Sequence, residues 1–112
     1  MDRNNTPIFV YTTWPDISSA KRVGGELVAA SLAACVNIMP GMISIYRWEG
    51  QQETGEEVVM IIKTRAEQVE AVIREVEARH PHETPAVISR PATGGSAGYL
   101  DWIAQMTPLV VK

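Results

Sequence analysis

The fold is decided by two segments rich in β-branched residues, CVNIMPGMISIYRWEG at residues 35–50 and EEVVMIIKT at residues 56–64. The residues between them, 49–55, are polar with a glycine near each end, and this predicts a turn that joins two strands into a hairpin. Residues 58–62 are apolar at every position, so both faces of the second strand require cover. What covers the second face becomes the central question of the fold.

Helices and further strands are predicted on either side of the hairpin. Runs of β-branched and aromatic residues indicate strands, and apolar residues at a spacing of three or four indicate helices. We expect strands at 8–13 and 86–89, helices at 17–34 and 66–79, a short third helix that ends at Met106, and a strand-like tail at Leu109–Val111.

Local signals mark the ends and bends of these elements. Asp16 is a good N-cap for the first helix, and residues 64–67 fit a capping box for the second. Ser96 can cap the third helix, and Pro40-Gly41 marks a bend or bulge in the long strand. Gly24-Gly25 inside the first helix predicts close packing of that helix on the sheet.

The element order predicts an α+β fold, a ferredoxin-like βαββαβ sandwich with a long hairpin between the second and third strands and a short C-terminal helix. Two helices then cover one face of a four-stranded antiparallel sheet. The other face is apolar, because residues 9–11 and 58–62 are largely apolar at consecutive positions. An exposed apolar face of this size predicts association, so we expect a homo-oligomer in which sheet faces pack together and in which the hairpin and the tail pair with neighbouring copies.

Composition bounds the class of protein. The 112 residues fit one domain, expected at 8–112 after a flexible tail at 1–7, and a hydrophobic content of 46% supplies a core. The net charge of -3, with scattered lysines and arginines, argues against nucleic-acid binding. A single cysteine allows no intrachain disulfide, and we find neither a signal peptide nor a membrane span, so we expect a cytoplasmic protein.

Several motifs, in order and spacing, resemble the CutA divalent-cation-tolerance family over nearly the whole chain. They are LAACVNI at 32–38, PG at 40–41, SIYRWEG at 44–50, IKT at 62–64, HPxExP at 80–85 and YLxW at 99–102. The resemblance implies a ferredoxin-like subunit, a homotrimer, kinship in shape with PII signalling proteins and a role in tolerance of copper and other divalent metals. It implies no enzyme reaction.

Three side chains are candidate metal ligands: His80, His82 and Cys35. Neutral imidazoles and a thiolate suit copper or zinc, and Glu83 adds a carboxylate. The family's proposed copper ligands include paired histidines, where this chain has Arg79-His80. The structural alternatives are that Cys35 is a small buried hydrophobe and that His80 caps carbonyls at the end of a helix. A further alternative, acid-base chemistry by His80 and Glu83, has no defined substrate, so we expect no enzyme activity.

A second candidate site combines Trp48, Lys63 and Tyr99, with Tyr46 nearby in sequence. Aromatic side chains around one ammonium group suit a small anion or an aromatic effector held in a cleft between subunits. Such a cleft would make the protein a PII-like sensor of small molecules. The alternative is that Tyr46 and Trp48 are interface anchors, because aromatic residues are enriched at subunit contacts.

Overall fold

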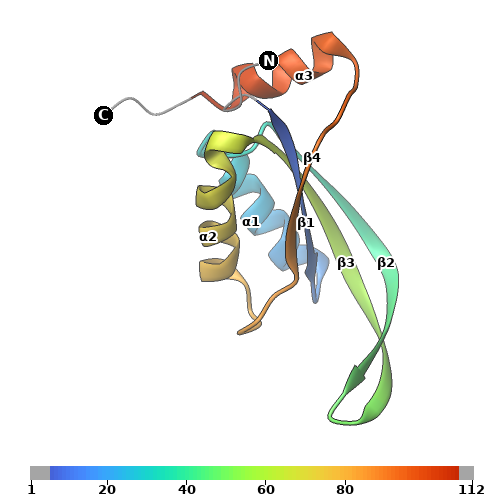
Figure 1. Ribbon diagram of the computed structural model, residues 1–112. Coiled ribbons are helices and arrows are strands. Elements are labelled where there is room, and N and C mark those ends of the chain that lie inside the picture. Colours follow the sequence, from blue (N-terminus) through green and yellow to red (C-terminus); the bar gives the residue numbers. More distant parts are fainter. Residues whose placement is uncertain (1–5, 109–112) are drawn as a thin grey trace.

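The computed structural model describes residues 6–108 and contains one antiparallel four-stranded sheet and three α-helices (Figure 1). The elements are β1 (Pro7–Trp14), α1 (Ile17–Ala29), β2 (Cys35–Trp48), β3 (Gln51–Arg65), the 3-10 turn η2 (Ala66–Gln68), α2 (Val69–Arg79), β4 (Val87–Pro91) and α3 (Ala97–Met106). The strand order β2-β3-β1-β4 and antiparallel pairing are those of the ferredoxin-like plan, which confirms the predicted fold of the chain.

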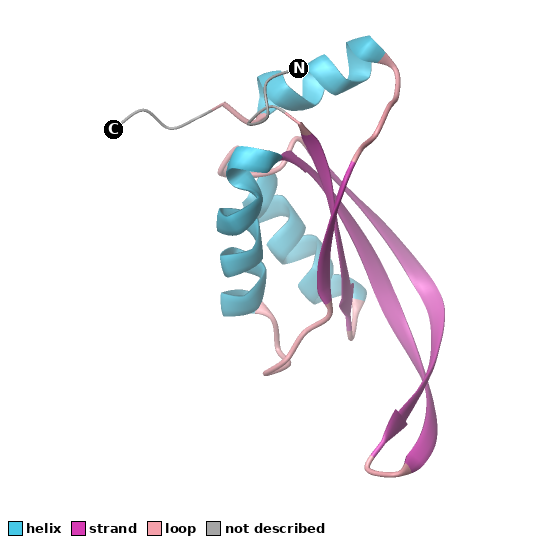
Figure 2. Ribbon diagram, in the orientation of Figure 1, coloured by secondary structure: helices cyan, strands magenta, loops and turns pink. Residues whose placement is uncertain are grey.

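Helices α1 and α2 lie on the same face of the sheet, and the long hairpin extends beyond them (Figure 2). The strands place Val10, Met60 and Ile62 under these helices, where they are fully buried. Val23 and Leu27 of α1 and Val72 and Val76 of α2 complete the same core. Burial of each such side chain contributes about 1.5–3 kcal/mol, so this face provides most of the stability of the folded chain.

The opposite face of the sheet stays largely apolar. Tyr11 pairs with Ile61 on one side and with Ile88 on the other, so the three side chains share the face that α1 and α2 do not cover. Tyr11 and Ile61 are half-buried, and Ile88 is 57% exposed. Helix α3 crosses only one end of the sheet (Figure 1). The sequence expectation of an apolar, incompletely covered second face is therefore confirmed for the described residues.

The hairpin turn is much tighter than predicted. β2 ends at Trp48 and β3 begins at Gln51, so only Glu49 and Gly50 form the turn. Both have positive φ, 50° and 78°, as a type I′ turn requires. The prediction of a turn over 49–55 was wrong because polar residues can continue a ladder whose two faces are both exposed to solvent.

Pro40 and Gly41 interrupt the β2–β3 ladder, as predicted. The register shifts between Met39 and Met42, and Gly41 has a φ of 83°. Proline cannot donate to the ladder, and glycine accepts the left-handed conformation that the bulge needs. The bulge bends the ribbon and changes which side chains of β2 face the rest of the chain.

Helix α1 ends at Ala29, five residues before the predicted end at 34. Ser31 has a positive φ of 59°, and the amides of Leu32 and Ala33 both donate to the carbonyl of Leu27. The amide of Ala34 then donates to Lys63 O and starts the pairing with β3. The alanines fit either conformation, so periodicity alone could not locate this end.

Two of the three predicted caps differ in the structure. Asp16 caps α1, since its Oδ1 accepts from the Ser19 amide at 2.7 Å. Thr64 Oγ1 instead donates to Leu32 O at 2.7 Å, so the predicted capping box at 64–67 is wrong. Ser96 is the N-cap of α3 but makes no side-chain capping bond. The predicted strand at Leu109–Val111 lies outside the described residues.

Candidate functional sites

His80 occupies a fixed position between α2 and β1. Its Nε2 lies 2.6 Å from Thr13 O, and its Nδ1 accepts from the His82 amide at 3.0 Å. A carbonyl oxygen can only accept, so Nε2 carries the proton and the imidazole is neutral. The ring also packs on Trp14, with 4.3 Å between ring centroids, and His80 is only 9% exposed.

This geometry assigns His80 a structural role within the chain. A metal ligand needs a free nitrogen lone pair, and the one lone pair of this imidazole points at the His82 amide. The backbone amide of His80 also closes α2 by donating to Val76 O. His80 therefore links the end of α2 and the loop after it to the end of β1, and in this conformation it does not act as a metal ligand.

The three predicted metal ligands are not gathered in one chain. Cys35 is half-buried at the start of β2 opposite Lys63, and its Sγ accepts a weak hydrogen bond from Asn37 Nδ2 at 3.9 Å. The alternative that Cys35 is a small buried hydrophobe is met only in part, because its side chain is half-buried. His82 is exposed, with its ring centroid 5.0 Å from that of His80. Among residues 6–108 no group of three histidine, cysteine, aspartate or glutamate side chains could hold a metal ion.

Lys63 and Tyr99 do come together, at the end of the sheet that α3 crosses. Lys63 Nζ donates to the Tyr99 hydroxyl at 2.8 Å and lies 5.1 Å from the centroid of that ring. Tyr99 also stacks on Trp102, with ring centroids 5.7 Å apart. One ammonium group beside two aromatic rings can contact an anionic or aromatic ligand.

Trp48 lies far from this cluster within one chain. It pairs with Gln51 beside the hairpin turn, and a strand rise of ~3.3 Å per residue puts Gln51 about 40 Å along β3 from Lys63. A cleft that contains Trp48, Lys63 and Tyr99 would need Trp48 from another copy. The cleft between subunits, and the PII-like sensing that rests on it, stay predictions.

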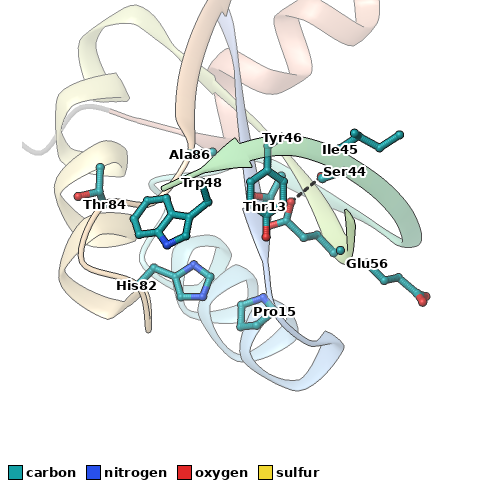
Figure 3. A pocket seen from close by; sticks show the side chains of 12 residues that line it. Thr13, Pro15, Ser44, Ile45, Tyr46, Trp48, Glu56, His82, Thr84 and Ala86 are labelled. Carbon is teal, nitrogen blue, oxygen red and sulfur yellow. Dashed lines mark hydrogen bonds between the residues drawn. The ribbon is translucent and has the colours of Figure 1, made fainter. Parts of the chain in front are cut away.

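The sequence reasoning missed a cavity of about 690 Å³ between the hairpin and the loop that follows α2 (Figure 3). Its walls come from the outer part of the β2–β3 ribbon, the end of β1 and the segment before β4. The lining residues are Thr13, Pro15, Ser44, Ile45, Tyr46, Trp48, Gly55, Glu56, Glu57, His82, Thr84 and Ala86. The alternation of Ser44, Tyr46 and Trp48 on one strand face was the available signal, but nothing in the sequence placed residues 82–86 opposite it.

The groups whose pKa values are shifted lie outside these sites. Hydrogen bonds from Ser19 hold the pKa of Asp16 below its usual value. Hydrogen bonding to Glu75, and then the charge of Glu26, raise the pKa of Arg79. Arg79 bonds Glu26 of α1 at 2.9 Å and Glu75 of α2 at 2.8 Å, so these charges join the two helices at the surface.

The family model and the related proteins found by comparison agree with each other. The family model described as CutA1 divalent ion tolerance protein matches residues 8–106. The chloroplastic protein CutA 1 of Oryza sativa is 43% identical over 100 residues, which are 89% of this chain and 56% of the plant protein. The divalent-cation tolerance protein CutA of Escherichia coli O45:K1 is 37% identical over 100 residues, 89% of each chain. This chain thus spans little more than half the length of the chloroplastic relative.

Solved structures agree with the fold. The CutA1 structure from Oryza sativa has a TM-score of 0.88 at 42% identity and covers 93% of this chain and 97% of its own. The CutA structure from Xylella fastidiosa has a TM-score of 0.89 at 38% identity, with coverage of 92% and 99%. A structure described as the periplasmic divalent cation tolerance protein CutA of Archaeoglobus fulgidus has a TM-score of 0.87 at 39% identity, with coverage of 91% and 99%.

Proposed function

The chain belongs to the CutA1 divalent ion tolerance family, and we propose that it acts in tolerance of divalent metal ions as a homotrimer. The observation that carries the proposal is the family match over residues 8–106, which includes all four strands of the sheet apart from the first residue of β1. The family is described by ion tolerance and not by a reaction, so we further propose that the chain is not an enzyme.

The apolar face of the sheet supports assembly. Ile88 is 57% exposed beside Tyr11, and Met39 of β2 is 48% exposed on the same face of the sheet. Large apolar side chains also lie exposed along the hairpin, where Ile45 is 67% and Trp48 64% exposed. Exposed apolar side chains on a sheet face are typical of subunit contacts, and closed rotational symmetry would bury that face in every copy.

Metal contact forms a weaker part of the proposal, because one chain does not assemble a metal site. His80 has both ring nitrogens engaged, which leaves the exposed imidazole of His82 and the half-buried thiol of Cys35 as the candidate donors for copper or another divalent ion. Single donors of this kind bind weakly. Calorimetric titration with copper should show weak binding that falls for His82→Ala and is kept in His80→Phe; equal loss in both variants would contradict this assignment.

The cellular location of the protein is a separate expectation. No helix among the described residues is both long and apolar enough to cross a membrane. The cytoplasmic location predicted from the sequence stays a prediction, since relatives are named chloroplastic and one is described as periplasmic.

Complementation tests the proposed function directly. A bacterial strain that lacks its own CutA and grows poorly on elevated copper should recover growth when it expresses this chain. Ile88→Asp places a charge on the apolar sheet face, so it should lower the mass measured by light scattering and reduce the recovery. Good expression of this chain without recovery of growth would refute the tolerance role, and a wild-type monomer at micromolar concentration would refute the trimer.

A further inference from the structure

The sheet face that α1 and α2 leave uncovered carries opposite charges at its two ends. Alternate residues of a strand share a face, so Glu53, Glu57 and Lys63 all lie on this side of β3. Glu53 and Glu57 belong to the part of β3 that extends past β1 toward the hairpin turn and pairs only with β2. Lys63 lies at the other end, beside Phe9, whose partner on β4 is Arg90. The face is therefore acidic toward the hairpin and basic at the end that α3 crosses.

These charges do not neutralise one another within one chain. Six positions of β3 separate Glu57 from Lys63, which is about 20 Å at a strand rise of ~3.3 Å per residue. Both ion pairs found among residues 6–108 involve Arg79, so neither side chain has a partner of opposite charge there. Ser44 Oγ donates to Glu57 Oε2 at 2.7 Å, and Lys63 Nζ donates to the Tyr99 hydroxyl at 2.8 Å. Neutral groups thus hold both charged side chains at the face.

The middle of the face, between the charged ends, is apolar. Tyr11 and Ile61 lie there half-buried, and Ile88 is 57% exposed. Apolar contact favours association of two such faces but gives it no direction. The charged ends supply the direction, because like charges brought together oppose association, whereas opposite charges favour it and fix its register.

We propose that copies of this chain associate head to tail through this face. The acidic end of one copy, formed by Glu53 and Glu57, lies against the basic end of the next, formed by Lys63 and Arg90. The proposal rests on the proposed homo-oligomer and specifies its contact. In a closed ring the strands then run around the symmetry axis, because strands parallel to the axis would hold like charges at one level. Tyr46 pairs with Glu53, so the same contact covers its exposed ring.

The test reverses the charge of each end separately and then of both ends together. Glu53→Lys with Glu57→Lys makes both ends basic, and Lys63→Glu with Arg90→Glu makes both ends acidic. Each pair of substitutions should raise the dissociation constant of the assembly about tenfold or more, measured by fluorescence-detected sedimentation over a dilution series. The chain with all four substitutions should recover most of this loss. Recovery separates charge pairing from loss of the Lys63–Tyr99 contact, since the fourfold variant also lacks that lysine.

Glu70→Lys with Glu77→Lys is the matched control, because it reverses two exposed charges of α2, on the other side of the sheet (Figure 2). This pair should leave the dissociation constant unchanged. Equal weakening by the control pair and by the Glu53 and Glu57 pair would overturn the proposal, as would a fourfold variant that recovers nothing. An oligomer that no reversal weakens would refute the head-to-tail contact alone, whereas a monomeric wild type would refute the homo-oligomer as well.

Discussion

Replacing Gly24 by alanine tests how closely α1 packs on the sheet. A Cβ at this position would lie 2.9 Å from Val36 Cγ2 and 3.5 Å from Met60 Cε. The valine is β-branched and stiff, so it cannot move aside cheaply. Overpacking of this kind costs about 1–3 kcal/mol, whereas the gain in helix propensity from glycine to alanine is about 1 kcal/mol. We therefore expect Gly24→Ala to lower the free energy of unfolding by up to about 2 kcal/mol.

Gly25→Ala is the matched control, because a Cβ there meets no atom within 4 Å. It receives the same propensity gain without the contact and should stabilise the chain by about 0.5–1 kcal/mol. Urea denaturation of both variants at one fixed protein concentration gives the comparison, because the stability of any chain that associates depends on its concentration. Equal stabilisation by the two substitutions would refute the close-packing argument.

Three further predictions follow from single contacts. Asp16 has a lowered pKa, so its contribution to stability is present above its unfolded-state pKa and is lost as pH falls through the folded-state pKa. Asp16→Asn should therefore weaken the loss of stability that acid causes in the wild type. An unchanged dependence of stability on acidic pH would contradict this role of Asp16. His80→Ala removes the hydrogen bond to Thr13 O and the packing on Trp14, and should lower the free energy of unfolding measured in urea by about 2 kcal/mol. A change within experimental error would contradict the structural role of His80. Tyr99→Phe loses only the exposed bond from Lys63 and should change stability by less than about 0.5 kcal/mol; a larger loss would contradict the exposed position of this contact.

The core of the fold could be predicted because periodicity and burial agree. The apolar run at 58–62 and the stripe through Val72 and Val76 fixed the strand, the helix and the face between them. Errors occurred where two conformations suit the same residues. The alanines after Ala29 fit a helix or a loop, and the polar residues 51–55 fit a turn or an exposed strand.

The candidate sites were less predictable, because they depend on contacts between distant segments. Residue type named His80 as a possible ligand, but only the position of Thr13 O and the His82 amide shows that both ring nitrogens are engaged. The contact between Lys63 and Tyr99 follows from where α3 crosses the sheet, 36 residues along the chain. Residue type had grouped Lys63, Tyr99 and Trp48 as one candidate site, but only the structure shows that Lys63 and Tyr99 are in contact and that Trp48 lies far from both within one chain.

The hairpin also has some features that the sequence determines and others that depend on the tertiary structure. By itself the sequence determined that residues 35–50 and 56–64 pair, that their ribbon bends at Pro40-Gly41, and that the second strand needs cover on both faces. These are local properties of side-chain period and backbone freedom. Only the tertiary structure decided that the turn contains two residues and that the ribbon closes a cavity with residues 82–86, because both depend on where the rest of the chain lies.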